Sequence, residues 1–298
     1  MNILLTGGTG YLGSKIAESL VSKHKVVILK RKSSKINFPL SSKNKLVFYD
    51  IENLSFKKLF QNLYSFDVVI HTATEYGREK TSYNSVKEIN VEIPLELLRN
   101  AINQKVKYFI NTDTYYNNEK AQINNLANYC KTKKMFVDEG SRLIQGENIS
   151  FINMRLEHVY GPKDKSSKFI NNILEKIKNN HELIDLSLCQ QRRDFIYVDD
   201  VVRAFSIITE NLTNFLTGFH QIGVGTGVDI KISDFLNIAK SITNSKSFLN
   251  YGAIPYSKNE IMDSKANISI LSNCGWKANC SIDQGIKNVL DCIKINKK

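Results

Sequence analysis

The sequence lacks any apolar run long enough to form a membrane-spanning helix. No stretch approaches the roughly 18 apolar residues that are needed to cross a bilayer. The chain opens directly on the apolar pattern of a strand, which differs from the charged start and apolar centre of a secretion signal. We therefore expect a cytoplasmic protein that has no membrane partner.

Metal and disulfide patterns are also missing from the sequence. The five cysteines are scattered, odd in number and never form a CxxC pair, so we expect free thiols in a reducing compartment. The five histidines form no HxH, HxxxH or HExxH spacing, so we expect no metal. The cysteines are Cys130, Cys189, Cys274, Cys280 and Cys292.

Arginine is scarce, although the formal net charge of the chain is +12. Only 8 of the 41 basic residues are arginines, and the lysines are spread along the chain without a basic helix or an aromatic-basic ladder. A nucleic-acid partner is therefore not expected. A positive field of this kind still favours an anionic small substrate.

The chain does have the length and composition of an ordinary globular protein. Its 298 residues, 42% hydrophobic and 23% charged, are enough for one large or two modest domains. In the first half, short apolar runs alternate with helix-like stretches, which is typical of a parallel, doubly wound sheet. The expected strands are residues 3–6, 25–29, 45–49, 68–71, 106–111 and 149–154.

Beyond "VYGP" at 159–162 this alternation loosens into shorter pieces. We expect a strand at 194–198 and helices near 167–178, 200–211, 232–243 and 281–294. The sequence thus predicts an α/β fold, Rossmann-like and doubly wound, with a smaller C-terminal α+β lobe that would bind a substrate. Residues 1–162, joined in part by 194–222, would form the first domain, and 163–298 would form most of the lobe.

The stretch "LLTGGTGYLGSKIAESL" places Gly7, Gly10 and Gly13 between a strand and an amphipathic helix. Glycines allow a tight turn and let backbone N–H groups approach a diphosphate at the positive end of a helix. A glycine-rich turn without a ligand is the plain alternative, but the strand before it and the helix after it favour a bound dinucleotide. Tyr11 and Leu12 lie in the same turn and are expected to contact the cofactor.

The second strand ends in the basic run "KRKSS", where an NAD-specific site usually carries an acidic residue. Arg31 can hold a 2′-phosphate in a charge-assisted fork, and Lys32 and Ser33 stand beside it. The pattern favours NADPH over NADH, and a solvated charge cluster is the alternative. Later strand ends give further expected cofactor contacts at Asp50, Ile51, Thr72, Ala73 and Thr74.

The stretch "YCKTK" sets Tyr129 and Lys133 four residues apart, on one face of a helix. A neighbouring ammonium favours the phenolate form of tyrosine, so the pair suits proton transfer in hydride chemistry, and Lys133 would also reach the nicotinamide ribose. Thr112, at the end of the 106–111 strand, would donate a hydrogen bond to the substrate carbonyl. A surface pair without chemistry is the alternative for YxxxK taken alone.

The order of the motifs resembles that of a known family. "TGGTGYLG", "NTD", "YCKTK", "RLEHVYGP" and "RRDFIYVDDVV" are similar to motifs of the extended short-chain dehydrogenase/reductases, in particular the NAD(P)-dependent nucleotide-sugar epimerases, dehydratases and reductases. The resemblance covers essentially the whole chain. "HTATEYG" and "NEIM" resemble reductases that act on the C4 ketone of a CDP-linked 3,6-dideoxyhexose in O-antigen synthesis.

This resemblance implies an NADPH-dependent 4-ketoreductase, an oxidoreductase in which Tyr129 donates the proton, Lys133 is its electrostatic partner and Thr112 anchors the carbonyl. Dehydratases of the family typically carry Thr-Asp-Glu where this chain has Thr112 to Thr114, so elimination would lack a base. Asp113 could orient the sugar or cap the following loop.

The resemblance also implies how the nucleotide sugar is held. Arg193 matches the arginine that contacts the diphosphate, and Lys258 would stand in for a C-terminal arginine that the chain lacks. His158 replaces an asparagine that touches the sugar nucleotide in many relatives. The expected substrate contacts are Glu75, Asp113, Thr114, His158, Arg193 and Lys258.

Several alternatives stay open at this point. The substrate could carry CDP or dTDP, and reduction of dTDP-4-keto-6-deoxyglucose to dTDP-fucose would give the same C4 configuration. A nucleotide-sugar C4 epimerase uses the same three groups. A non-enzymatic NADP-sensing protein would keep the fold, although such proteins tend to lose the tyrosine-lysine pair. A homodimer is expected, through helices near 83–102 and 129–144.

Overall fold

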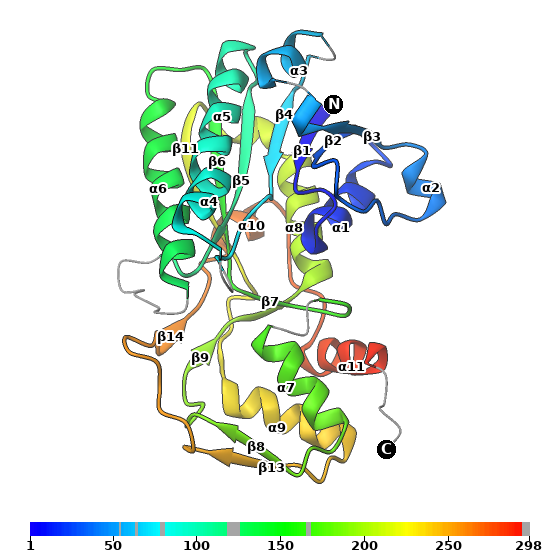
Figure 1. The fold of residues 1–298 in the computed structure, drawn as a ribbon, viewed down its shortest axis with the longest axis vertical. Helices are drawn as coiled ribbons and strands as arrows, with labels where there is room; N and C mark the ends of the chain where they lie inside the picture. The colour runs from blue at the N-terminus through cyan, green and yellow to red at the C-terminus, as the bar shows by residue number, and fades with distance from the viewer. Residues whose placement is uncertain (54, 63–64, 78–80, 118–125, 165–167, 294–298) are drawn as a thin grey trace. The chain divides into compact units, whose positions relative to one another are not determined.

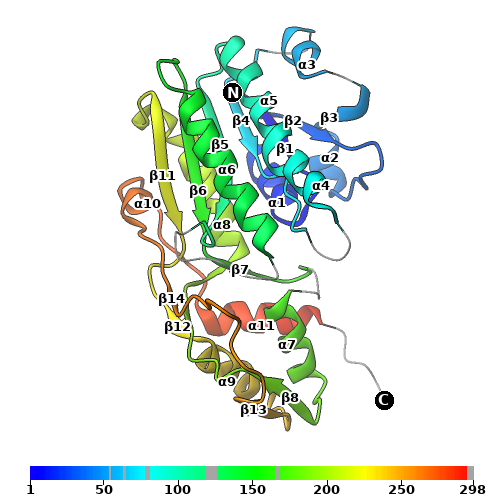
Figure 2. The ribbon, with the colours of Figure 1, turned by 60° about the vertical axis from the view of Figure 1, so that its left-hand side comes forward.

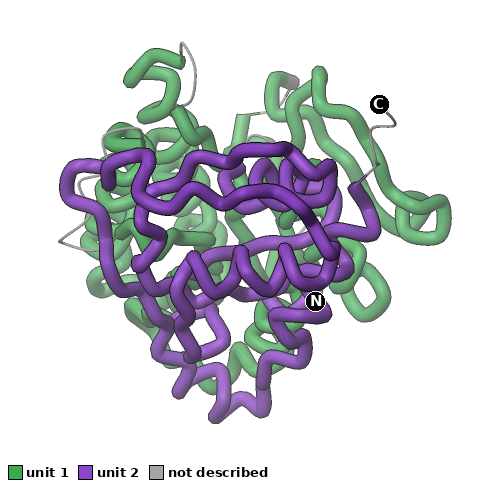
Figure 3. The backbone as a smooth tube through the Cα atoms, turned by 90° about the horizontal axis from the view of Figure 1, so that it is seen from below, with its two compact units in different colours: residues 1–119, 123–155, 202–222 green, residues 120–122, 156–201, 223–298 purple. Residues whose placement is uncertain are grey.

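The computed structural model describes every residue except 54, 63–64, 78–80, 118–125, 165–167 and 294–298. The chain folds into two compact units, which Figure 3 draws in different colours. Unit 1 contains residues 1–119, 123–155 and 202–222, and unit 2 contains residues 120–122, 156–201 and 223–298. Each unit is described by itself below.

A seven-stranded sheet, in the order β11-β6-β5-β4-β1-β2-β3, organises unit 1. The strand pairs from β3 through β2, β1 and β4 to β5 all run parallel. The inner strands β1, β2 and β4 contain continuous, buried runs of Val, Ile and Leu, as is typical of strands that are covered on both faces. The strands are β1 (Asn2–Thr6), β2 (Lys25–Lys30), β3 (Val47–Asp50), β4 (Val68–His71), β5 (Tyr108–Thr114), β6 (Ser150–Leu156) and β11 (Gly218–Val224).

Helices lie on both faces of this sheet (Figures 1 and 2). On one face are α4 (Tyr83–Lys87), α5 (Ile93–Asn103) and α6 (Ala127–Leu143), and on the other are α1 (Tyr11–Leu20) and α8 (Val198–Glu210). Shorter pieces are α2 (Leu40–Lys43), α3 (Phe56–Asn62) and the 3₁₀ turns Ile51–Asn53 and Leu212–Asn214.

A cluster of three phenylalanines lies between α6 and the sheet in the core of unit 1. The rings of Phe109 on β5, Phe136 on α6 and Phe151 on β6 have centroids 5.6, 5.7 and 6.2 Å apart, and all three are fully buried. Each buried side chain of this size contributes roughly 1.5–3 kcal/mol. Because Tyr129 and Lys133 lie on the same buried face of α6 as Phe136, this packing fixes them against the sheet.

The helix expected near 83–102 is present and contains a π-helical turn. A π-helical turn, Glu88–Glu92, separates α4 from α5 and buries Asn90 and Val91. Such turns widen a helix locally and often occur at functional sites.

The described residues of unit 2 form short strands and the helices given below, together with the first turn of α8. Tyr160, Phe195 and Phe235 are at its centre, with the rings of Phe195 and Phe235 only 4.2 Å apart. The strands are β7 (His158–Tyr160), β8 (Leu183–Leu186), β9 (Arg192–Arg193), β10 (Phe195–Tyr197), β12 (Ile230–Lys231), β13 (Phe248–Tyr251) and β14 (Asp263–Ser264). The helices are α7 (Phe169–Lys178), α9 (Ile232–Thr243), α10 (Ser269–Asn273) and α11 (Ile282–Cys292).

Among the residues that the structure describes, no helix is long and apolar enough to cross a membrane. Nor does any group of three or more His, Cys, Asp and Glu side chains in that part of the chain come together to hold a metal ion. The five cysteines are free thiols.

Candidate active site

The glycine turn between β1 and α1 leaves room only for backbone. Gly7 has φ +70°, and a Cβ there would lie 2.5 Å from the backbone nitrogen of Ala73. A Cβ on Gly13 would lie 2.2 Å from the carbonyl oxygen of Gly7. Gly10 is the N-cap of α1 and has no side chain to cover the first turn of the helix. This turn therefore fits the diphosphate of a dinucleotide.

Two residues of the basic run at the end of β2 contact acidic side chains of this chain. Lys30 pairs with Asp50 at the end of β3, and the backbone N–H of Lys32 donates to both carboxylate oxygens of Glu52, at 3.1 and 3.0 Å. The Arg31 side chain is exposed, and no contact of its guanidinium is seen in the described residues. The sequence did not identify Glu52 as a site residue, because Glu52 comes close to Lys32 only through the pairing of β2 with β3.

Lys133 and Thr112 meet at the end of β5. The Lys133 ammonium donates to the carbonyl oxygen of Thr112 at 2.5 Å, and the lysine is only 2% exposed. The Thr112 hydroxyl is buried, and none of the described residues hydrogen-bonds it. A buried hydroxyl without a partner is costly, which makes it a candidate for binding a ligand.

Tyr129 stands one helical turn from Lys133 and is 6% exposed. Burial raises the pKa of Tyr129 well above its usual value, so the phenol carries its proton at neutral pH. Burial lowers the pKa of Lys133, and the nearby Asp113 carboxylate opposes that shift.

Asp113 takes part in a buried polar network. Its Oδ2 accepts from the amide of Asn153 on β6 at 2.9 Å and from the amide of Asn117 in the turn after β5 at 3.0 Å. Asn153 in turn accepts from the amide of Asn111 at 2.7 Å. Burial raises the pKa of Asp113, against the lowering effects of Lys133 and of these amides.

Asn90, in the π-helical turn, was not identified as a site residue from the sequence. Its side chain accepts from the Glu75 N–H and donates to the Glu75 carbonyl, both at 2.8 Å, and it also donates to Thr132 Oγ1 on α6 at 3.0 Å. It thereby ties the segment after β4 to α6. An asparagine among the apolar residues of a helix was the available signal.

The segment after β4 lies against the tyrosine. The Tyr76 ring is stacked on that of Tyr129, with centroids 4.8 Å apart and an interplanar angle of 27°. Glu75 accepts from the Gly77 N–H at 3.0 Å through its carboxylate. Thr72 donates its hydroxyl to the carbonyl of Thr6. Arg78, which follows in the same "TEYGRE" stretch and would be expected near the nicotinamide and the sugar, lies outside the described residues.

The remaining candidate substrate contacts belong to unit 2. Arg193 is 3% exposed and donates to Glu260 at 2.7 Å and to the Met262 carbonyl at 3.3 Å. Burial, aided by Arg193, holds the pKa of His158 well below its usual value, so the imidazole is neutral. Lys258 is exposed.

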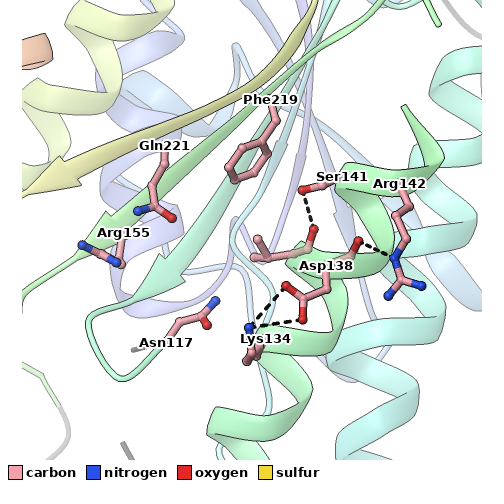
Figure 4. A pocket seen from close by; sticks show the side chains of 9 residues that line it. Asn117, Lys134, Asp138, Ser141, Arg142, Arg155, Phe219 and Gln221 are labelled. Atoms are coloured by element: carbon pink, nitrogen blue, oxygen red, sulfur yellow. Dashed lines mark hydrogen bonds and ion pairs between the residues drawn. The ribbon is translucent and has the colours of Figure 1, made fainter. Parts of the chain in front are cut away.

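A hollow of about 590 Å³ opens on unit 1 between α6, β6 and β11 (Figure 4). Its walls contain none of the site residues predicted from the sequence, so we do not identify it with the catalytic centre. The lining residues are Asn117, Lys134, Val137, Asp138, Ser141, Arg142, Arg155, Phe219 and Gln221.

A glycine turn at the end of a parallel sheet, together with a buried Tyr-Lys pair on the helix α6, is typical of dinucleotide-binding α/β oxidoreductases. The chain belongs to the NAD dependent epimerase/dehydratase family, which it matches over residues 3–221. It is thus an enzyme of a family that acts on nucleotide sugars.

Two curated relatives are similar over nearly the whole chain. CDP-abequose synthase of Salmonella muenchen is 35% identical over 290 residues, which cover 97% of this chain and 96% of the relative. CDP-abequose synthase of Salmonella typhimurium is 34% identical over 296 residues, covering 97% of each. The resemblance drawn from the sequence motifs is therefore confirmed.

Solved structures confirm the predicted fold class. UDP-glucose 4-epimerase from Thermotoga maritima superposes with a TM-score of 0.78 at 23% identity, covering 98% of each chain. A variant of UDP-glucuronic acid 4-epimerase from Bacillus cereus, in complex with NAD, superposes with a TM-score of 0.80 at 22% identity, covering 98% of this chain and 99% of the other. At these identities the likeness shows the fold alone.

Proposed function

We propose that this chain is an NADPH-dependent ketoreductase that acts on the C4 ketone of a nucleotide-linked 4-keto-6-deoxyhexose. The observation that carries the proposal is the buried Thr112 hydroxyl without a described partner, beside Lys133 on the helix that holds the protonated Tyr129. CDP-abequose, formed from CDP-4-keto-3,6-dideoxyglucose for an O-antigen or related polysaccharide, is the product favoured by the similarity to two CDP-abequose synthases.

Each of the three groups has a distinct task in this reaction. A bound reduced nicotinamide supplies the hydride for the carbonyl carbon. Tyr129 donates its proton to the carbonyl oxygen, and Thr112 donates a hydrogen bond to the same oxygen and orients it. Lys133, whose ammonium is anchored on the Thr112 carbonyl, stabilises the phenolate that remains.

The residue after Asp113 supports reduction over dehydration. Elimination of water needs a base beside the sugar, and Thr114, buried and uncharged, cannot serve as one. Asp113 accepts hydrogen bonds from two amides, which suits a role in shaping the end of β5.

NADPH is supported by the exposed guanidinium of Arg31, which can hold a 2′-phosphate. Lys30 is already paired with Asp50, so Arg31 is the stronger candidate. Glu52 brings a negative charge beside the same run and opposes a phosphate there. The preference for NADPH over NADH therefore depends on whether the attraction of a 2′-phosphate to Arg31 exceeds its repulsion by Glu52.

The nucleotide would be held by unit 2. Arg193 would bind the diphosphate, exchanging Glu260 for phosphate oxygens, with Lys258 as a further cation and His158 as a neutral contact. We propose that unit 1 is the cofactor domain and unit 2 the substrate domain of a cytoplasmic homodimer.

The test is NADPH oxidation by the purified protein, with NMR of the C4 configuration of the product. CDP-4-keto-3,6-dideoxyglucose and dTDP-4-keto-6-deoxyglucose are compared in parallel, each with NADPH and with NADH. Turnover of the CDP substrate to the axial C4 alcohol is the expected result. Preferred turnover of the dTDP substrate would identify dTDP-fucose as the product, and no turnover of either would reject the ketoreductase.

A C4 epimerase is the second candidate, and Glu52 is the observation that favours it. A carboxylate beside the β2 turn suits the ribose hydroxyls of NAD, the cofactor present in the complex of the Bacillus cereus epimerase variant. An epimerase of this kind retains its cofactor, so the protein would be purified with bound NAD and would interconvert C4 epimers without added cofactor. A reductase exchanges its cofactor at every turnover.

A further inference from the structure

The Tyr129 side chain is stacked on a second tyrosine. The ring of Tyr76, in the segment after β4, lies against it with the ring centroids 4.8 Å apart and an interplanar angle of 27°. Tyr129 is buried, whereas Tyr76 is half-buried. Two rings in this arrangement attract each other beyond the area that they bury. The stack therefore restrains the side-chain torsions of Tyr129, for which the helix backbone allows more than one rotamer.

The backbone on both sides of Tyr76 is held by hydrogen bonds. On one side, the backbone N–H and carbonyl of Glu75 are both bonded to the side chain of Asn90, at 2.8 Å each. On the other side, the Gly77 N–H donates to the Glu75 carboxylate at 3.0 Å. Asn90 itself is 1% exposed, in the π-helical turn. The point from which the Tyr76 side chain leaves the backbone is therefore fixed.

Asn90 also connects this segment to the backbone of Tyr129. Its amide donates to Thr132 Oγ1 at 3.0 Å, and the Thr132 hydroxyl donates to the carbonyl oxygen of Tyr129 at 3.0 Å. The Tyr129 ring is thus linked through Tyr76 and its neighbour Glu75 to Asn90. From Asn90 the hydrogen bonds return through Thr132 to the Tyr129 carbonyl. One closed set of contacts therefore holds both the ring and the backbone of Tyr129.

We propose that Tyr76 is a positioning residue for Tyr129, and that its stacked ring holds the phenol in the orientation from which it donates its proton. This proposal rests on the proposed ketone reduction. In that step hydride adds to C4, the O–H bond of Tyr129 breaks, its proton moves to the carbonyl oxygen, and the electron pair stays on the phenolate. A displacement of a reacting group by about 1 Å can lower a rate by as much as 100-fold. A ring that restrains the proton donor therefore affects kcat.

The kinetic test removes either the hydroxyl or the whole ring of Tyr76. Tyr76→Phe keeps the ring, and Tyr76→Leu replaces it with a smaller apolar side chain at a half-buried position. We expect kcat to fall roughly 3- to 10-fold in Tyr76→Leu, with KM changed by less than about 2-fold, and to stay near the wild-type value in Tyr76→Phe. A rise in KM with unchanged kcat in Tyr76→Leu would overturn the proposal and make Tyr76 a substrate contact.

Tyr83→Leu is the matched control, since Tyr83 is another half-buried tyrosine that contacts α6. Its hydroxyl donates to the sulfur of Met135 at 3.8 Å, and the Lys131 ammonium lies 5.3 Å from the centroid of its ring. The control therefore removes a tyrosine ring from α6 and leaves the stack on Tyr129 in place, so kcat should be kept. Equal losses of kcat in Tyr76→Leu and Tyr83→Leu would overturn the proposal, because they would show a general effect of packing on α6.

A second measurement needs no substrate. A fluorotyrosine placed at position 129 has a ¹⁹F chemical shift that depends on the ring current of a stacked neighbour. Tyr76→Leu should shift this signal, and Tyr76→Phe and Tyr83→Leu should leave it at the wild-type position. An unshifted signal in Tyr76→Leu would overturn the proposal even if the protein reduces a nucleotide sugar. A shifted signal in a protein that reduces neither the CDP nor the dTDP substrate would uphold the stack and reject the proposed function instead.

Discussion

Removing the side chain of Asn90 tests whether the π-helical turn positions the catalytic helix. Asn90 is 1% exposed and makes four hydrogen bonds, to Thr74, Glu75 twice and Thr132. A typical intramolecular hydrogen bond contributes about 1 kcal/mol net, and water can replace part of this at the half-buried Glu75. We therefore expect Asn90→Ala to lower the free energy of unfolding by about 2–4 kcal/mol, with the lost side-chain packing included.

The assay is urea denaturation followed by circular dichroism, with kcat measured on the same preparations. Asn100→Ala is the matched control, since Asn100 lies on α5 and makes one local hydrogen bond to the Glu96 carbonyl. The control should lose less than about 1 kcal/mol. Because Tyr76 depends on Asn90, kcat of Asn90→Ala should also fall under conditions where the variant is fully folded. Equal losses of stability in the two variants would refute the reasoning.

Three further variants address the chemistry and the cofactor. Tyr129→Phe should keep cofactor binding, measured by fluorescence, while kcat falls roughly 100- to 10,000-fold; unchanged turnover would exclude Tyr129 as the proton donor. Gly13→Ala should abolish cofactor binding, because the new Cβ would lie 2.2 Å from the Gly7 carbonyl oxygen, and calorimetric titration with NADPH measures the loss. Glu52→Gln should raise the ratio of kcat/KM for NADPH over NADH, because it removes the charge beside the Lys32 N–H; a lower ratio would show that Glu52 does not oppose the phosphate.

Much of the fold was predictable because its signals are local. Continuous apolar runs gave the six parallel strands expected in the first half, each within a few residues of its observed position. β11 was missed because "GFHQIGV" is an edge strand with exposed Phe219 and Gln221 and shows no apolar run. The π-helical turn was missed because helical periodicity does not reveal one extra residue in a turn.

The candidate site was predictable as a set of residues but not as a set of contacts. Spacing alone puts Tyr129 and Lys133 on one face of a helix, and the structure has them on the buried face of α6. The stacking of Tyr76 on Tyr129 depends on how the segment after β4 lies along α6, and that is a tertiary property. Glu260, which pairs with Arg193, lies 67 residues further along the chain, and no local sequence pattern predicts a pair at that separation.

The order in which unit 1 is assembled along the chain has a consequence for its synthesis. Residues 202–222, which contain most of α8 and of β11, belong to this unit, yet they follow residues 156–201, which belong to unit 2. Ser206 on α8 bonds to Ser19 on α1 at 2.8 Å, and the Gly218 N–H bonds to the Ile149 carbonyl at 3.0 Å. β11 is the neighbour of β6 in the sheet, so during translation one edge of β6 remains unpaired until residue 222 has left the ribosome. A fragment that ends near residue 160 should aggregate, however complete its cofactor motifs are.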